Sequence, residues 1–387
     1  MEHHRRHVVI WHIARPIVML ICLIRFNFRA KQNKIPGPYI LISNHVTDWD
    51  PILLTAAFKN QMYYVASEHL MRLGWVSSLL NWLVAPIARQ KGGSGAGAVK
   101  GMLRALKAGA NVCVFAEGNR TWNGVTGVFP PSTGKLVRSS GASLVTYRLT
   151  GGYLSSPRWS GDSIRRGRMS GEVVKVYSPE ELKAMTPAAI NEAIASDIYE
   201  NAGSRQQISP VHYRGKRLAE HLETYLFVCP ACGALHTLKS SGNFIECTHC
   251  GAKAEYLDTG ILSGNMGPET VEAWSALQEQ RFPDILSAAG DGLVFTDSPL
   301  DCKKINPDHS VTELGSGAIS LYRDRLELPG NVVIPAEKLN GVAVRGASLL
   351  FICTVDGDNY ELKPLGVCNT VKYSDACRHL GYITSGV

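Results

Sequence analysis

A histidine and an aspartate lie five positions apart in the segment 44–50 (Asn-His-Val-Thr-Asp-Trp-Asp), between the apolar run 39–43 and Pro51. On a regular helix such positions are about 140° apart around the axis and cannot meet, but a turn can fold Asp50 back onto His45. A carboxylate on one imidazole nitrogen fixes the tautomer and leaves the other nitrogen free to take a proton from a hydroxyl group. The pattern therefore predicts base-catalysed attack by an alcohol, with His45 as the base.

Two other interpretations of this segment are open. Asp50 precedes a proline suited to the first helical position, so it is also suited to cap a helix beside an incidental histidine. Asp48 is a second carboxylate that can orient His45.

A second polar block, Phe-Ala-Glu117-Gly118-Asn-Arg120, follows the apolar run 111–115. The carboxyl end of a strand is where α/β sheets place their ligand sites. Arg120 offers a two-pronged fork for a phosphate, and Glu117 can hold that fork or accept a hydrogen bond from a substrate hydroxyl. Arg89 ends another short apolar run and is a second candidate phosphate ligand, unless it is simply a solvated surface arginine.

The elements that position these residues alternate along the chain. Apolar runs predict strands over 39–43, 62–66, 86–88, 111–115, 144–149 and 172–177. Helical patterns fall between or after them, from Pro51, over 75–83, after the Gly-rich loop 92–97, and over 187–202 with Thr186 as the cap. Such alternation predicts an α/β fold with a mixed sheet covered by helices on both faces.

Together these residues resemble the glycerolipid acyltransferase family over roughly residues 30 to 210. That family has a His-x4-Asp block, an arginine closing a short apolar strand, and a Phe-Pro-Glu-Gly-x-Arg block, in the order and spacing seen here. The resemblance implies that His45 is the general base and that Asp50 orients it. It also implies that the phosphate of the acyl acceptor is bound by Arg89, Glu117, Gly118 and Arg120.

The reaction implied by the resemblance is transfer of a fatty acyl group from a thioester of coenzyme A or acyl carrier protein to lysophosphatidate, giving phosphatidate. Another lysolipid or glycerol 3-phosphate is the alternative acceptor. No protein nucleophile is needed, and the sequence has no Gly-x-Ser-x-Gly elbow of a serine esterase. Two positions depart from the family: Ala116 replaces a proline, and Val-Thr-Tyr at 145–147 stands where the fourth block usually has one. The second departure leaves the acceptor contacts open.

Four of the ten cysteines form two Cys-x-x-Cys pairs: Cys229 with Cys232, and Cys247 with Cys250. Four thiolates at this spacing make a closed tetrahedral zinc site, in which no water can be activated. We therefore expect a structural zinc ribbon over 225–257, with paired disulfides as the alternative. The other six cysteines are scattered through apolar contexts, which is typical of a reducing cytosol.

The remaining segments are a connector over 258–290 and a β-rich domain over 291–387. The latter has short alternating strands and weakly resembles a pleckstrin-homology or GRAM-like barrel that ends in a helix near 373–380. Such a barrel would dock the enzyme on a membrane or on a partner protein.

The N-terminal residues 1–30 predict a membrane-binding helix. An apolar segment over 8–24 is interrupted by His12, Arg15 and Pro16, and its longest unbroken run is far short of the roughly 20 residues that span a bilayer. We expect an interfacial helix that holds the enzyme at the cytoplasmic face of the membrane as a peripheral or monotopic protein. A helix packed on a cytosolic domain is the alternative.

The formal net charge of +7 favours an anionic partner, such as lipid head groups, coenzyme A phosphates or nucleic acid. The basic stretch 158–168 is either a solvated face or a site for such a partner. A basic chain with a zinc ribbon also suits a non-enzymatic adaptor for nucleic acid or protein. However, the ribbon lacks the interleaved aromatic residues that stack on bases, so no nucleic-acid partner is expected.

Overall fold

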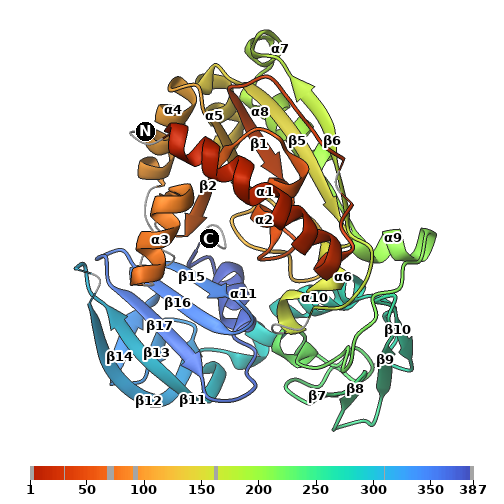
Figure 1. Cartoon of the computed structure of the whole chain (residues 1–387). Helices are drawn as coiled ribbons and strands as arrows, with labels where there is room; N and C mark the ends of the chain where they lie inside the picture. Colours follow the sequence, from red (N-terminus) through yellow and green to blue (C-terminus); the bar gives the residue numbers. More distant parts are fainter. Residues whose placement is uncertain are drawn as a thin grey trace. The chain divides into compact units, whose positions relative to one another are not determined.

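Figure 1 shows the computed structural model of the protein, which describes residues 4–29, 31–67, 74–89, 95–160, 164–308 and 310–383. Tertiary contacts divide the chain into two compact units. The first comprises residues 1–157 and 164–214, and the second comprises residues 158–163 and 215–387.

The first unit is built on a six-stranded sheet in the order β3-β2-β4-β1-β5-β6. The first five strands pair in parallel and β6 runs antiparallel to β5. The strands are β1 (Tyr39–Ser43), β2 (Met62–Ser67), β3 (Ile87–Arg89), β4 (Asn111–Phe115), β5 (Ser143–Thr150) and β6 (Ser170–Tyr177). The predicted α/β class with a mixed sheet is confirmed.

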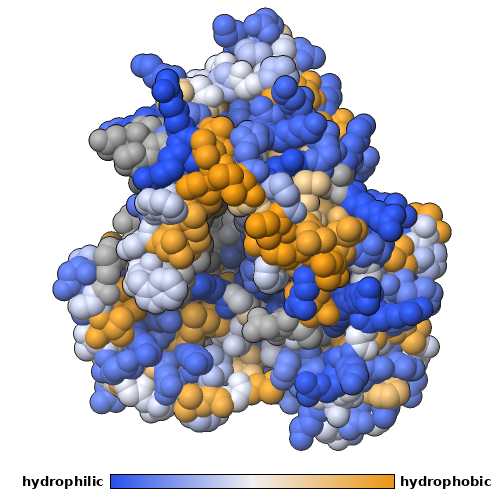
Figure 2. Space-filling view, in the orientation of Figure 1, coloured by the Kyte–Doolittle hydropathy of each residue, from blue (hydrophilic) through white to orange (hydrophobic). Residues whose placement is uncertain are grey.

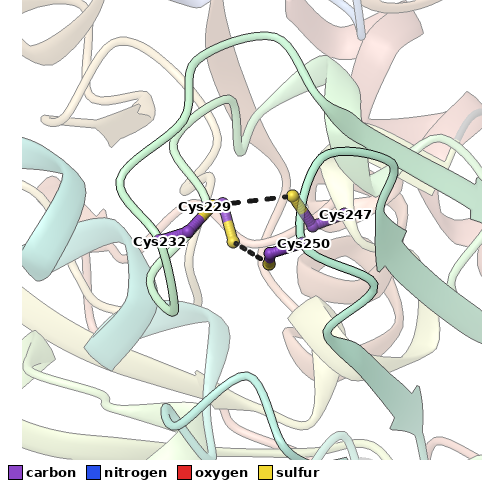
Figure 3. Close-up of side chains that lie close together, drawn as sticks. All are labelled: Cys229, Cys232, Cys247 and Cys250. Carbon is purple, nitrogen blue, oxygen red and sulfur yellow. Dashed lines mark hydrogen bonds between the residues drawn. The ribbon is translucent and has the colours of Figure 1, made fainter.

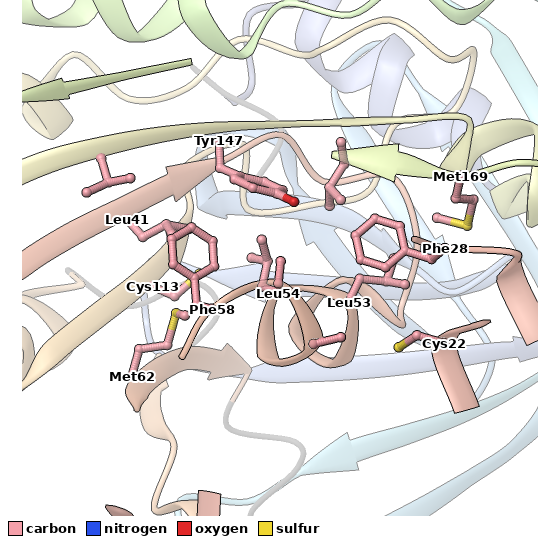
Figure 4. Close-up of a cluster of buried hydrophobic side chains, with 14 of the residues drawn as sticks. Cys22, Phe28, Leu41, Leu53, Leu54, Phe58, Met62, Cys113, Tyr147 and Met169 are labelled. Carbon is pink, nitrogen blue, oxygen red and sulfur yellow. The ribbon is translucent and has the colours of Figure 1, made fainter. Parts of the chain in front are cut away.

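Helices cover both faces of this sheet. One face packs through Tyr39, Leu41 and Tyr147 against α1 (His4–Phe26) and α2 (Asp50–Ala57), in the core that Figure 4 shows. The other face packs against α4 (Ala96–Lys107), α5 (Ser132–Ser140) and α8 (Pro187–Ile198). Successive strand residues alternate between these two cores, as the pleat of a strand requires.

The remaining helices of the first unit are α3 (Trp75–Val84), which contacts α1, and the short α6 (Gly152–Ser155), α7 (Pro179–Ala184) and α9 (Ala202–Ile208). The helix expected over 187–202 begins as predicted, because Thr186 accepts a hydrogen bond from the backbone N–H of Ala189. It ends earlier, at Ile198. Asn201 then caps α9 by accepting from the N–H of Ser204.

Helix α1 is continuous through His12, Arg15 and Pro16, the residues that interrupt the apolar segment. Arg15 is tolerated because its side chain turns toward the protein and donates to the carbonyl groups of Ala56 and Phe58, at the C-terminal end of α2. By its length and composition alone, the helix is long and apolar enough to cross a membrane. Core helices of soluble proteins and N-terminal signal sequences can have the same length and composition.

The second unit contains a four-stranded antiparallel sheet in the order β10-β9-β8-β7, comprising β7 (Leu238–Ser241), β8 (Phe244–Cys247), β9 (Lys253–Tyr256) and β10 (Leu262–Gly264). Helix α10 (Val271–Ala289) occupies most of the expected connector and packs on this sheet's loops. The indole N–H of Trp274 donates to the carbonyl of Val228, and the Gln278 side chain accepts from the N–H of Phe227.

A seven-stranded antiparallel sheet follows, in the order β14-β13-β12-β11-β17-β16-β15. Its strands are β11 (Leu293–Ile305), β12 (Val311–Tyr322), β13 (Arg325–Leu328), β14 (Val332–Pro335), β15 (Leu339–Arg345), β16 (Leu349–Thr354) and β17 (Asn359–Pro364), and helix α11 (Val371–His379) comes last. The strands β11 and β12 have 13 and 12 residues and are much longer than the short strands expected.

A buried polar cluster joins the two sheets of the second unit. Lys372 on α11 is 1% exposed, and its Nζ lies 2.6 Å from the Asp297 carboxylate and 3.3 Å from His236 Nδ1. The Tyr373 hydroxyl donates to Asp297 at 2.6 Å. Because His236 belongs to the small sheet's loops and Asp297 to β11, the expected ribbon and β-rich domain are parts of one compact unit.

Within the basic stretch 158–168, two arginines are buried rather than solvated. Arg158 belongs to the second unit, is 4% exposed, and donates to the carbonyl groups of Val344 and Gly346. Its neighbour Trp159 is fully buried with its ring edge-on to Tyr256. Arg165 is 3% exposed. For these two arginines the interpretation as a solvated face is therefore wrong.

Candidate active site

The polar segments 44–50 and 117–120 follow the carboxyl ends of two neighbouring parallel strands, β1 and β4. Ser43, the last residue of β1, pairs with Phe115, the last residue of β4. His45 and Glu117 each follow two positions later, so the parallel register places them side by side. The His45 imidazole stacks on the Phe115 ring, with centroids 4.4 Å apart and planes 21° apart.

Asn44 fixes the point at which the chain leaves the sheet. Its side-chain carbonyl accepts from the N–H of Leu149 at 2.8 Å, and its amide donates to the carbonyl of Leu149 at 2.9 Å. The side chain thus takes the place of the next strand residue in the ladder with β5. The sequence alone assigned Asn44 no role. The available signal was an asparagine directly after an apolar strand, where a side-chain amide is often buried and hydrogen-bonded to backbone groups.

The His45 imidazole is held by Asp50, as the His-x4-Asp spacing predicts. Nδ1 of His45 lies 2.8 Å from Oδ2 of Asp50, and the histidine side chain is 18% exposed while the aspartate is fully buried. The Asp50 carboxylate also accepts from the N–H groups of Val46 and Thr47 and from the Thr47 hydroxyl. This network orients the ring and leaves Nε2 as the nitrogen that Asp50 does not engage.

The alternative roles for the two aspartates can be compared with this geometry. Asp50 is the first residue of α2, and its carboxylate bonds the turn before the helix rather than capping the helix itself. Asp48 has a 74% exposed side chain and lies 2.9 Å from the Nε of Arg120. It therefore pairs with the arginine and not with the imidazole.

Glu117 contacts the backbone on both sides of the turn. Its Oε1 accepts from the N–H of His45 at 2.7 Å, and its Oε2 accepts from the N–H of Gly127 at 2.6 Å. Desolvation raises the pKa of Glu117 to about 8, and the two N–H donors act in the opposite direction. With both oxygens engaged, Glu117 holds His45 in place. The sequence left open whether Glu117 holds Arg120 or accepts from a substrate hydroxyl, and in the structure its partners are the two backbone N–H groups.

The two arginines lie beside the Glu-Gly-Asn-Arg turn. Gly118 has φ +72°, and a Cβ there would lie 3.0 Å from an Nη atom of Arg89. Glycine at 118 thus allows both the turn and the approach of the Arg89 guanidinium. After Arg120, the N–H of Thr121 donates to the carbonyl of His45 at 3.0 Å. The structure therefore brings all six predicted residues to the carboxyl ends of β1, β3 and β4.

The two departures from the expected motifs lie in the core. Ala116 is 5% exposed. The segment 145–147 lies inside β5, where Thr146 bonds Asp197 and Tyr147 packs under the sheet. The side chains of 145–147 are buried and supply no group to the site.

The four predicted zinc ligands face one another in the second unit (Figure 3). The Sγ atoms of Cys229 and Cys250 are 3.8 Å apart, those of Cys232 and Cys247 are 3.9 Å apart, and all four lie within 4.8 Å of one another. A tetrahedral zinc with Zn–S bonds of about 2.3 Å has S···S edges of about 3.8 Å. The cluster therefore has the size of a metal site, and the Thr237 hydroxyl lies 3.1 Å from the Cys247 sulfur.

Comparison with protein families finds a match to part of the first unit. Residues 25–150 match the family model described as Acyltransferase. No curated protein sequence matches the chain.

Several solved structures are similar to parts of the chain. The 1-acyl-sn-glycerophosphate (LPA) acyltransferase PlsC from Thermotoga maritima is 14% identical over 53% of this chain and 79% of its own, with a TM-score of 0.38. The linker-DH/PH domains of p115-RhoGEF are 12% identical over 30% of this chain and 47% of their own, with a TM-score of 0.19. The C-terminal domain of an unknown protein from Leishmania infantum is 15% identical over 27% of this chain and 96% of its own, with a TM-score of 0.17.

The burial of Glu117, which raises its pKa, predicts how the stability of the protein depends on pH. A carboxyl whose folded-state pKa is raised to about 8 favours the folded state at low pH, and this contribution is lost as the pH rises from its ordinary pKa through 8. Glu117→Gln cannot ionise, so we expect its melting temperature to fall less than that of the wild type between pH 5 and pH 8.5. The variant should also lose about 1–3 kcal/mol overall, because an amide NH2 faces a backbone N–H. The exposed Glu192→Gln is the matched control, and an unchanged pH profile for Glu117→Gln would contradict the assignment.

Proposed function

Residues 25–150 match the Acyltransferase family model, and on that premise we propose that this chain transfers a fatty acyl group from a thioester to the hydroxyl group of lysophosphatidate. The product is phosphatidate, and the donor is an acyl group on coenzyme A or acyl carrier protein. The observation that carries the proposal is the buried Asp50 carboxylate 2.8 Å from His45 Nδ1, at the carboxyl ends of parallel strands.

In the proposed mechanism, Nε2 of His45 takes the proton of the acceptor hydroxyl while its oxygen attacks the thioester carbonyl. The Asp50 carboxylate stabilises the resulting imidazolium. When the tetrahedral intermediate collapses, the C–S bond breaks and the imidazolium returns the proton to the departing thiolate. The acyl group passes directly from sulfur to oxygen, so no protein nucleophile is required.

Arg89 and Arg120 are the proposed ligands of the acceptor's phosphate. Arg120 is paired with Asp48, whose side chain is 74% exposed. The Arg120 side chain is only 10% exposed, so it is held in place while Asp48 can turn into solvent, and a phosphate dianion can take the place of that carboxylate. Gly118 contributes to phosphate binding by leaving room for the Arg89 guanidinium, and Glu117 contributes by holding the turn.

Activity should depend on His45 and Asp50 and not on Asp48. We expect His45→Ala and Asp50→Asn to lower kcat by about 10²–10⁴-fold, the usual contribution of a positioned base. Asp48→Asn is the matched control, because it removes a carboxylate of the same turn that pairs with Arg120 and not with the imidazole ring. The measurement is transfer of a labelled acyl group from acyl-CoA and from acyl carrier protein to lysophosphatidate, another lysolipid and glycerol 3-phosphate. A wild type that forms no product with any combination of donor and acceptor would refute the proposed reaction. Product with another lysolipid or glycerol 3-phosphate, but not with lysophosphatidate, would reassign the substrate.

We also propose that the enzyme works at the cytoplasmic face of the membrane, with α1 in the interface. The inner face of α1, including Trp11, Cys22 and Phe26, is buried. Its outer face exposes Val9, Ile13, Ile17, Leu20, Ile21, Leu23 and Ile24. This apolar surface is visible along α1 in Figure 2. In a soluble helix the outer face is polar, so the reversed pattern supports contact with lipid.

Helix α3 adds to this apolar surface. Trp75 is 76% exposed and Trp82 is 51% exposed, and the guanidinium of Arg6 on α1 lies 5.1 Å from the Trp82 ring. Tryptophan and arginine together are typical of residues at the level of lipid head groups.

The variant Ile13→Ser/Ile17→Ser should bind vesicles of anionic lipid more weakly than the wild type. Burial of one isoleucine contributes about 1.5–3 kcal/mol, so we expect at least roughly tenfold weaker partitioning for each lost side chain. Val176→Ser/Ile208→Ser is the control, since these residues are 43% and 85% exposed on β6 and α9 of the first unit, outside α1 and α3. Co-sedimentation with vesicles tests this, and a wild-type protein that stays in the supernatant would overturn the membrane assignment.

The four-cysteine cluster is proposed to hold one structural zinc ion. Protein purified without chelator should contain one zinc per chain, and Cys229→Ser should lose it together with stability, because metal binding is coupled to folding in such sites. Cys353→Ser, which alters a cysteine outside the cluster, should keep the metal. Elemental analysis showing substantially less than one zinc per wild-type chain would exclude a zinc ribbon.

A further inference from the structure

Helix α4 has two different faces. Its inner face, with Ala98, Met102, Ala105 and Leu106, is buried in the core beneath the sheet. Its outer face carries three cations, Lys100, Arg104 and Lys107, together with the apolar residues Ala96, Val99 and Leu103, and we call this set the α4 basic face. These six residues border a shallow, open area on the surface of the helix.

The three cations of the α4 basic face are exposed. Among the described residues, no acidic side chain forms an ion pair with them. Elsewhere in the described parts of the chain, basic residues such as Arg148, Lys303 and Lys338 are paired with acidic neighbours. The charges of the α4 basic face are therefore available to an external partner, and they differ from scattered surface lysines in lying together beside apolar residues.

The spacing of the cations limits the shape of that partner. Positions 100, 104 and 107 lie on one stripe and span about 10 Å along the helix axis. One phosphate group is too small to contact all three. An acidic helix with carboxylates at the same i, i+4, i+7 spacing matches the stripe, and its apolar side chains can pack on Val99 and Leu103.

The position of α4 in the first unit distinguishes a protein partner from a bilayer. Helices α4, α5 and α8 cover one face of the sheet, whereas α1 and α2 cover the opposite face. If α1 lies in the membrane interface, the α4 basic face is on the water side of the sheet. The same flat bilayer cannot contact both faces.

The chain direction places one end of α4 near the candidate active site. Arg89 ends β3, and α4 is the connection from β3 to the parallel strand β4. A helix that connects parallel strands starts at the edge of the sheet where the first strand ends, which is the edge that holds His45. A partner lying along α4 can thus present a flexible arm to the reacting groups.

We propose that the α4 basic face docks an acidic helix of the small soluble protein that carries the acyl thioester. The inference rests on the proposed acyl transfer and specifies its donor: the acyl group arrives on a protein rather than on a free nucleotide thioester. Docking is electrostatic with an apolar centre, so it weakens as salt is added.

Direct binding tests this inference without depending on turnover. The probe is a fluorescently labelled acyl carrier protein bearing a palmitoyl group, titrated with the full-length chain in fluorescence anisotropy at low and physiological salt. We expect at least tenfold weaker binding for Lys100→Glu/Arg104→Glu/Lys107→Glu. Because these reversals also oppose the helix dipole, the neutral variant with glutamine at the three positions is measured in parallel and should show a smaller loss.

The matched control is Lys216→Glu/Lys239→Glu/Lys363→Glu, which makes the same change of net charge on exposed lysines of the second unit. It should bind the probe as the wild type does. Equal losses in the control and the α4 variants would show a general charge effect, and unchanged binding in the α4 variants, or no binding by the wild type, would overturn the proposal. Weaker binding of the α4 variants to anionic vesicles would also overturn it, in favour of a lipid surface.

Turnover with three donors separates this proposal from the proposed function. The α4 variants should show a raised KM for the acyl carrier protein donor and an unchanged KM for acyl-pantetheine, which has no charged carrier. An equal rise with acyl-CoA would assign the α4 basic face to a nucleotide donor instead. If the wild type transfers from no donor yet binds the carrier protein through α4, the proposed reaction fails while the docking surface stands.

Discussion

The arrangement of the first unit depends on a buried carboxylate that must be satisfied. Asp50 is fully buried, and an isolated ion there would be strongly unfavourable. It is instead surrounded by the His45 ring, two backbone N–H groups and a hydroxyl, all from the turn that follows β1. The turn cannot relax without stripping the carboxylate of these donors. The imidazole is therefore positioned by the energetics of burial and not by a single hydrogen bond.

Two further side chains act as substitutes for backbone around the same turn. Asn44 continues the ladder with β5 after β1 has ended, and Glu117 bridges the N–H groups of His45 and Gly127. Each satisfies polar backbone groups that would otherwise be left unpaired near the core, and together they hold His45 from both neighbouring strands. A site built in this way is rigid at its base. Beside it, the ion pair between Asp48 and Arg120 has one partner in solvent, because Asp48 is 74% exposed while Arg120 is only 10% exposed.

The second unit shows a similar dependence on buried polar groups. Lys372, Asp297, Tyr373 and His236 tie α11 and β11 to the loops of the four-cysteine cluster. A metal ion held by the four cysteines would therefore stabilise the large sheet as well as the loops that carry the cysteines. This coupling is a physical reason for one compact unit where the sequence indicated a ribbon, a connector and a separate β-rich domain.

The sequence by itself determined the interactions that are local in the chain. His45 and Asp50 are five residues apart, and the two residues of each Cys-x-x-Cys pair are three apart, so a local turn is enough to bring them together. The choice of Asp50 over Asp48 as the partner of His45 needed the structure. The alternating strands and helices likewise determined the α/β class. The tertiary structure alone decided which partner each long-range side chain meets: Glu117 reaches the backbone of a residue 72 positions away, and Asn44 one 105 positions away. It also decided that Arg158 is buried and that the outer face of α1 is apolar, because burial depends on which surfaces pack together, and no spacing within one segment encodes that.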